Sequence, residues 1–430
     1  MTDRLQKHIH LPLVTAIIVG LWIIFQIFYI CIYWGAPQYS DAYNYQKWAL
    51  DCYNSGNWYP KTEQFYSEPY ICYAGYINFL IACLHIFGSF TFVPIINLFL
   101  NILQLFALYQ ICKKICNQTV AYYFTIFYCI LLSNISIVAV TTSDLFFMTF
   151  MMCSITLIKK NHLLLILSGM LITYANYVRP FAVLYLLPIF FYVLYHKFNW
   201  KYYVSYFSGI ILMTLLLLTF SYTINGTTHI SSTTGGINLI IGANDDLNGS
   251  YTDKVFQEGN IGYIENSTTY DVFQKDSIWK SRSIEWIKEN PRKYILYAPV
   301  KMVRLWWADS YSHLLLSNEK HNNSETAHII SVLVNSLTYY VILLFFCIGI
   351  LKLGKQIWGY KGIFLIPLVE GCILHMIMYG GMRYHYPFMP IIILYAAIGL
   401  YLLQKGKICQ HDTKPCEPNV LSATSSCTAD

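Results

Sequence analysis

The chain alternates between long apolar runs and short polar segments. A helix needs about 20 apolar residues to cross the ~30 Å hydrocarbon core of a membrane, and runs of that order recur from residue 11 to residue 403. The pattern predicts an all-α polytopic membrane protein with ten transmembrane helices, or eleven if 70–88 also crosses. The predicted crossings are 11–34, 91–112, 121–138, 145–158, 163–177, 180–195, 203–223, 329–351, 362–378 and 386–403.

Five parts are expected along the chain. They are a cytoplasmic tail (1–10), an N-terminal transmembrane module (11–224) with a first outer loop (35–70), a large outer loop of mixed structure (225–328), C-terminal transmembrane helices (329–404), and a cytoplasmic, disordered tail (405–430). The first outer loop is rich in Tyr and Trp, which favours short interfacial helices. In the large loop, Asn290-Pro291 is expected to separate two helices within 278–307. The second of these is expected to lie on the membrane with Lys301 and Arg304 on one side.

Lysines mark one end of the predicted helices. Cytoplasmic segments carry an excess of Lys and Arg, so this end is assigned to the cytoplasm. The protein is assigned to the inner (cytoplasmic) membrane, with its opposite end facing the periplasm or outside. The assignment is regular only if 70–88 lies along the interface or re-enters instead of crossing. The lysines are Lys113 and Lys114, Lys159 and Lys160, Lys197 and Lys201, Lys352, Lys355 and Lys361, and Lys405 and Lys407.

The amino-acid composition agrees with a membrane protein and gives no sign of a nucleic-acid partner or of a zinc site. Hydrophobic residues make up 56% of the chain and charged residues 12%, a balance that no soluble globular protein of this size needs. The net charge of +6 comes from basic loop residues, so it does not indicate a nucleic-acid partner. The 13 cysteines lie mostly in apolar runs and show no zinc-finger spacing, so they are interpreted as small core residues.

Four charged residues fall at the outer ends of predicted helices, namely Asp41, Asp144, Arg179 and Arg383. Asp41 is a candidate general base or acceptor-orienting carboxylate, and the alternative is a helix cap or a solvated loop acid. The arginines are candidates for gripping phosphate through the planar guanidinium, although Arg179 could instead be an interfacial, snorkelling side chain. Asp144 could simply cap the helix predicted at 145–158.

Other polar residues have two interpretations each. Glu370 falls near the middle of a predicted crossing, where an acid is either functional or a structural polar contact. His385 is either a metal ligand or, as is commoner, a hydrogen-bonded structural residue. Lys301 and Arg304 either hold a lipid phosphate or dock a helix on headgroups. The chain lacks the G-x-x-x-x-G-K-S/T, G-x-G-x-x-G and H-E-x-x-H motifs, so nothing supports nucleotide hydrolysis or zincin chemistry.

The chain resembles the GT-C superfamily of integral-membrane glycosyltransferases in three motifs, which follow one another in the same order as in that superfamily. Within the superfamily, the chain is similar to bacterial proteins that resemble the dolichyl-phosphate-mannose–protein mannosyltransferases and the aminoarabinose transferases. Ser40-Asp41-Ala42-x-x-Tyr45, with Gly56-Asn57-Trp58-Tyr59-Pro60 after it, resembles the first outer loop of the family, whose Asp is the catalytic carboxylate. The run 242–251 resembles Gly-Asn-Asn-Pro-x-Ala-x-Gly-x-Tyr, with Asp245 in place of the Pro. Arg383-Tyr384-His385-Tyr386-Pro387 resembles the Arg-Tyr-x-x-Pro start of a late helix, and Arg179-Pro180 is a weaker match.

The resemblance covers the chain from the first helix to about residue 403. It implies a GT-C-like fold and inverting transfer of a sugar from a polyprenyl-phosphate donor on the outer face. The expected partners are that donor, membrane lipids and an acceptor that is a lipid, a glycan or a protein. No cofactor is certain. A divalent metal ion is left open, because superfamily members differ on this point and the first loop has a single Asp at the key position.

The resemblance also implies roles for individual residues. Asp41 is the catalytic carboxylate, and the donor phosphate is held by Arg179 and Arg383, with Lys301 or Arg304 as further ligands. Supporting positions are assigned to Tyr45, Asp144, Asn244, Glu370, Tyr384 and His385.

Other functions stay open from the sequence. A secondary transporter or flippase of lipid-linked sugars would place ionisable and helix-breaking residues near mid-membrane and show internal repeats. The chain has no convincing repeat, and Glu370 is almost its only mid-membrane charge. An outer-face polysaccharide polymerase or ligase would share the arginines. A non-enzymatic scaffold would leave the charged residues at the outer helix ends unexplained.

Overall fold

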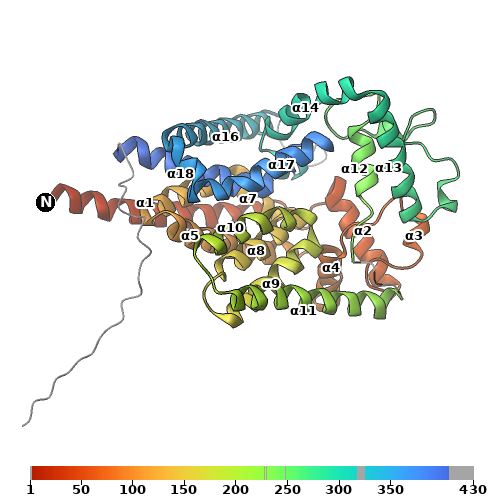
Figure 1. Ribbon diagram of the computed structural model, residues 1–430, viewed down its shortest axis with the longest axis horizontal. Helices are drawn as coiled ribbons and strands as arrows, with labels where there is room; N and C mark the ends of the chain where they lie inside the picture. Colours follow the sequence, from red (N-terminus) through yellow and green to blue (C-terminus); the bar gives the residue numbers. More distant parts are fainter. Residues whose placement is uncertain (1, 227, 229, 247, 317–324, 406–430) are drawn as a thin grey trace, which may run out of the picture.

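The computed structural model describes residues 2–226, 228, 230–246, 248–316 and 325–405, and within these ranges all regular structure is helical (Figure 1). The predicted all-α fold is therefore confirmed. The α-helices are α1 (Thr2–Ile32), α2 (Ser40–Asn54), α3 (Gln64–Ser67), α4 (Ala74–Phe87), α5 (Val93–Ile115), α6 (Gln118–Ile130), α7 (Leu132–Ser136), α8 (Ser143–Thr156), α9 (His162–Val178), α10 (Leu186–Tyr195), α11 (Trp200–Asn225), α12 (Gly235–Gly242), α13 (Val272–Glu289), α14 (Pro291–Trp306), α15 (Tyr311–Leu316), α16 (Glu325–Leu353), α17 (Ile366–Ile377) and α18 (Met389–Lys405). The 3₁₀ helices are η1 (Ile137–Ala139), η2 (Pro180–Tyr185), η3 (Asp253–Phe256), η4 (Ser267–Thr269), η6 (Gly354–Trp358), η7 (Tyr360–Leu365) and η8 (Tyr386–Phe388). The tail expected to be disordered, from residue 406 on, lies outside the described residues.

Six helices of the described chain are long and apolar enough to cross a membrane. They are His10–Ile32, Val93–Ile115, Trp200–Ile224, Ile329–Trp358, Tyr360–Ile377 and Tyr386–Gln404. The predicted crossings 145–158, 163–177 and 180–195 coincide with shorter apolar helices, Ser143–Thr156, His162–Val178 and Pro180–Tyr195. The chain is thus a multi-pass membrane protein.

The crossing predicted at 121–138 is not one straight helix. It consists of Gln118–Ile130 and Leu132–Ala139, which are bent by 72° relative to each other. Leu131 has extended backbone, and the Asn134 side chain donates to the Tyr128 carbonyl (3.0 Å). A polar side chain that bonds a backbone carbonyl offers an alternative to the helix ladder, and hydropathy alone does not detect it.

The ambiguous segment 70–88 forms α4, a largely buried helix of 14 residues. At 1.5 Å per residue its length is about 21 Å, which is shorter than the ~30 Å hydrocarbon core. The helix α8, which matches a predicted crossing, has the same number of residues, so the placement of 70–88 at the interface stays a prediction from the lysine pattern.

Two helix pairs depend on glycine. α9 packs against α11 and α16 against α18. A Cβ at Gly169 would collide with the Tyr206 carbonyl, and one at Gly349 would collide with the Tyr395 carbonyl. Small residues of this kind allow membrane helices to approach closely, where van der Waals contact replaces the hydrophobic effect as the driving force.

The helices of the first outer loop and of the large loop gather at one end of the molecule, away from the N-terminus of α1 (Figure 1). We call this end, formed by α2, α3, α12 and α13, the polar end. The segment 35–70 contains two short helices, α2 and α3, and their expected position at the membrane interface stays a prediction. The expected break at Asn290-Pro291 is confirmed, with Pro291 as the first residue of α14.

Candidate active site

Asp41 lies in the first turn of α2 and is the accessible member of the site. Carboxylates are favoured at this position because the helix N-terminus carries partial positive charge. The Asp41 side chain is 40% exposed, and Oδ2 contacts Nη1 of Arg383. Asp41 is therefore neither a helix cap, since the N-cap residue is Tyr39, nor a freely solvated loop acid.

Asp144 occupies the first turn of α8 and is almost fully buried, with 3% of its side chain exposed. Oδ2 accepts from Nε of Arg383 (2.9 Å), and Oδ1 contacts Nη1 of Arg179. The interpretation of Asp144 as a helix cap is wrong, because Thr142 is the N-cap and its Oγ1 accepts from the Asp144 backbone N–H. Asp144 instead joins the two arginines.

Arg383 is held in the loop between α17 and α18. Its Nη2 lies 3.4 Å from the hydroxyls of Tyr45 and Thr142. Its guanidinium carbon lies 5.4 Å from the ring centroid of Tyr311 and 5.9 Å from that of Tyr45. These cation–π and hydrogen-bond contacts fix the plane of the guanidinium and with it the orientation of both carboxylates.

The charges alternate along one connected chain of side chains, Asp41–Arg383–Asp144–Arg179, which we call the carboxylate–arginine chain. Buried charges are costly unless they are paired, and here two acids and two bases neutralise one another. The side chains of Arg383, Asp144 and Arg179 are 7%, 3% and 10% exposed, against 40% for Asp41. Asp41 is thus the most accessible group of the carboxylate–arginine chain, and Arg383 holds its carboxylate in place.

A small cavity of about 20 Å³ lies beside the carboxylate–arginine chain. A cavity of that size holds about one water molecule. Its walls include Thr142, Asp144, Arg383, Ser133 and Asp309. Because Asp309 lines the same cavity as Asp144 and Arg383, a third carboxylate lies next to the carboxylate–arginine chain.

Asp309 and His385 form a buried pair that the sequence does not reveal. Asp309 Oδ1 lies 2.9 Å from His385 Nε2, and its Oδ2 accepts from the Ser133 hydroxyl (2.5 Å). His385 Nδ1 lies 2.7 Å from the Leu305 carbonyl, which can only accept, so Nδ1 carries a proton. His385 is a hydrogen-bonded structural residue, the commoner of its two interpretations. Within the described residues, no group of three or more His, Cys, Asp or Glu side chains could hold a metal ion.

Lys301 and Arg304 do not share an exposed side of α14, contrary to expectation. Lys301 is fully buried because α14 packs against α17. Its ammonium donates to the carbonyls of Met376 (3.1 Å) and Ile377 (3.3 Å), at the C-terminal end of α17. Burial lowers the pKa of Lys301 to about 8. Arg304 is exposed, and its Nε donates to the Asn248 carbonyl (3.2 Å).

Replacement of Lys301 by Met should lower the stability of the protein without weakening binding of the polyprenyl-phosphate sugar that the sequence resemblance predicts as donor. Met keeps the apolar stem but removes the donor to the Met376 carbonyl, and a buried acceptor left unpaired costs about 1–3 kcal/mol. We expect a lower melting temperature of the purified protein and an unchanged KM for the donor. Lys293→Met on the same helix is the control, since Lys293 is 38% exposed and pairs with an exposed Asp245. A raised KM with unchanged melting would instead identify Lys301 as a phosphate ligand.

Of the other supporting residues predicted from the sequence, some contact Arg383 and others have partners elsewhere. Tyr45 and Asp144 contact Arg383 directly. The Tyr384 hydroxyl bonds that of Tyr379 (2.6 Å), and its ring stacks on His375. Asn244 is buried and donates to the Ile240 and Ile241 carbonyls, so it closes the end of α12. Glu370 is half-buried on α17, and its Oε2 has no hydrogen-bond partner among the described residues.

The three sequence motifs meet at the polar end. A Cβ at Gly242 would collide with the Met378 carbonyl. Further along, the Gly249 carbonyl accepts from the Gly380 N–H (2.9 Å). The middle motif therefore packs against the segment that carries Arg383, and Arg383 contacts Asp41 of the first motif. Segments 342 residues apart in the sequence thus build one site.

No protein-family model and no curated protein sequence matches the chain. Among solved structures, the chain is similar to the apo oligosaccharyltransferase of Archaeoglobus fulgidus, with 12% sequence identity and a TM-score of 0.49. The similarity covers 90% of this chain and 51% of that protein. The chain thus spans about half the length of that oligosaccharyltransferase.

Proposed function

We propose that the protein is a membrane glycosyltransferase that moves a sugar from a polyprenyl-phosphate donor to an acceptor at the polar end, with inversion at the anomeric carbon. The observation that carries the proposal is the carboxylate–arginine chain, in which the accessible carboxylate of Asp41 is held by the buried Arg383 and a second buried arginine, Arg179, is linked through Asp144. Such a unit combines a base with cations next to it. The three motifs that resemble GT-C transferases converge on the same site.

In the proposed reaction, Asp41 and the two arginines of the carboxylate–arginine chain have different roles. A hydroxyl or similar group of the acceptor donates to Asp41 and loses its proton as it attacks the anomeric carbon. The bond between that carbon and the phosphate oxygen breaks, and the phosphate leaves with its electron pair. Attack from the side opposite the leaving group inverts the anomeric centre. Holding the two reactants in line supplies much of the rate, since phosphate is already a good leaving group.

Arg179 and Arg383 are the cations that stabilise the charge developing on the leaving phosphate. Each guanidinium has five N–H donors in a planar fork. The Arg179 contact with Asp144 engages Nη1, and we assign its other N–H donors to the phosphate. Asp144 contacts both guanidinium groups and fixes their positions relative to each other. The proposed reaction requires no further residue to activate the donor.

The test is a transfer assay in which a membrane extract supplies the acceptor. The purified protein is incubated with that extract and with radiolabelled polyprenyl-phosphate hexoses and pentoses. We expect release of polyprenyl phosphate together with label in a new product whose anomeric configuration is opposite to that of the donor. Nucleotide sugars should give no product. Movement of the intact lipid-linked sugar across vesicles without bond cleavage would instead identify a flippase.

A further inference from the structure

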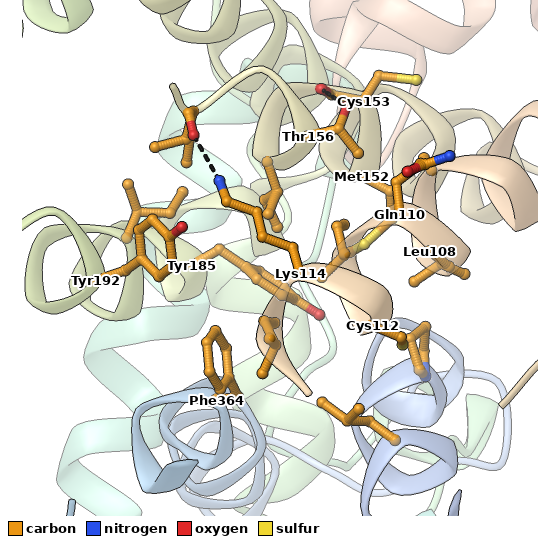
Figure 2. Close-up of a pocket in the computed structure, with 18 of the residues that line it drawn as sticks. Leu108, Gln110, Cys112, Lys114, Met152, Cys153, Thr156, Tyr185, Tyr192 and Phe364 are labelled. Atoms are coloured by element: carbon orange, nitrogen blue, oxygen red, sulfur yellow. Dashed lines mark hydrogen bonds between the residues drawn. The ribbon is translucent and has the colours of Figure 1, made fainter. Parts of the chain in front are cut away.

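A second, much larger cavity of about 480 Å³ lies among α5, α8, α10 and α18 (Figure 2). Its size is that of a small-molecule site, and its walls are mainly apolar, including Leu108, Met152 and Phe364. Two wall residues, Leu103 and Phe106, are 45% and 59% exposed on the outside of α5. The cavity therefore extends to the hydrocarbon-facing surface of a membrane-spanning helix and is accessible to lipid chains.

Two lysines line one end of this cavity. Lys114 is in the last turn of α5, and Lys159 follows the end of α8. The Lys114 ammonium donates to the Ile158 carbonyl (2.9 Å) and lies 5.0 Å from the centre of the Tyr192 ring (Figure 2). An ammonium has three donors, so Lys114 can serve the end of α8 and an external acceptor together.

The two ammonium groups repel each other, and no Asp or Glu belongs to the residues that line the cavity. The cavity thus combines an apolar volume with uncompensated positive charge at one end. A neutral hydrocarbon chain would fill the volume but would not neutralise the two lysines. A soluble anion would neutralise the lysines but would not cover the apolar walls. A lipid with a phosphate head satisfies both.

We infer that this cavity binds an anionic phospholipid, with an acyl chain against the apolar walls and its phosphate between Lys114 and Lys159. Basic pockets between membrane helices on the cytoplasmic side are suited to such headgroups. The site lies on the helix ends opposite the carboxylate–arginine chain: Asp144 is in the first turn of α8, and Lys159 follows its last turn. It is therefore separate from the site of the proposed transfer and does not depend on it.

Binding of defined lipids to the purified protein tests the inference. Native mass spectrometry and thermal unfolding are compared with phosphatidylglycerol, phosphatidylcholine and polyprenyl monophosphate. We expect phosphatidylglycerol to bind most tightly and to raise the melting temperature. Lys114→Gln and Lys159→Gln should each weaken its binding roughly fivefold, since a Lys near a lipid surface contributes on that order. Thr156→Trp, which enlarges a side chain that lines the cavity and keeps both lysines, should abolish binding.

Lys201→Gln is the matched control, because Lys201 is exposed in the first turn of α11 and does not line the cavity. Equal binding of phosphatidylglycerol and phosphatidylcholine would overturn the inference. So would an equal loss in Lys201→Gln, which would indicate diffuse surface attraction. Preferential binding of polyprenyl monophosphate would also overturn it and assign the cavity to the sugar carrier. A Lys114→Gln variant that melts at a lower temperature without lipid but binds phosphatidylglycerol as before would also overturn it, since Lys114 would then only close the end of α8.

Discussion

Replacement of Asp41 by Asn is expected to reduce the rate of sugar transfer by roughly 10²–10⁴-fold, the range that a positioned general base contributes. Asn has nearly the same shape and can still accept a hydrogen bond from Arg383, but it cannot take a proton from the acceptor. The Asp41 side chain is 40% exposed, so loss of its ion pair should cost about 1 kcal/mol of stability or less. The measurement is the single-turnover rate at saturating donor, with the melting temperature recorded for the same preparation.

Asp51→Asn on the same helix is the control for the Asp41 variant. Asp51 is 53% exposed and forms an ion pair with Lys61 at 3.1 Å, so its replacement removes the same charge from the same end of the molecule. We expect Asp51→Asn to retain the native rate within about twofold, since surface pairs contribute little. A native rate in Asp41→Asn, or equal losses in both variants, would show that Asp41 is not the base.

Much of the fold follows from hydropathy and charge. Every predicted crossing corresponds to helical structure, because an apolar run of the required length has few alternatives to the helix in a membrane. The bend at Leu131 does not follow from hydropathy, since it depends on a contact between Asn134 and the Tyr128 carbonyl. Such side-chain bonds to the backbone leave no mark on the apolar periodicity. For segment 70–88, the interfacial or re-entrant placement rests on the lysine pattern alone and stays a prediction.

The sequence predicts the site one residue at a time, but it does not predict the pairing. Thr142 and Asp144 both suit a helix start, and only the structure shows which one caps. The partner of Asp144, Arg383, is 239 residues away, a separation that no local pattern can bridge. The sequence places Lys301 among phosphates because it does not show which face of α14 packs against α17. The sequence analysis does not identify Asp309 as a site residue, because Asp309 follows a helix end and belongs to no recognised motif.

Replacement of Asp144 by Asn should destabilise the protein by about 3–5 kcal/mol, the cost of leaving buried charges without their partner. Asp144 holds two arginines whose side chains are 10% and 7% exposed. After the substitution, Asp41 alone balances them. Thermal unfolding in detergent measures the effect. Asp245→Asn is the control, since Asp245 is 80% exposed in its pair with Lys293, and its loss should cost no more than about 1 kcal/mol.

Charge balance predicts that a second substitution repairs part of this damage. Arg179→Gln combined with Asp144→Asn restores one acid and one base, Asp41 and Arg383, so the double variant should be more stable than Asp144→Asn alone. The two single variants and the double variant form a cycle, and a non-additive term of about 1–3 kcal/mol is expected for groups in direct contact. Strict additivity would mean that Asp144 acts through packing and not through its charge. The double variant should nevertheless transfer sugar slowly, because it retains Asp41 but lacks one of the cations proposed to stabilise the leaving phosphate.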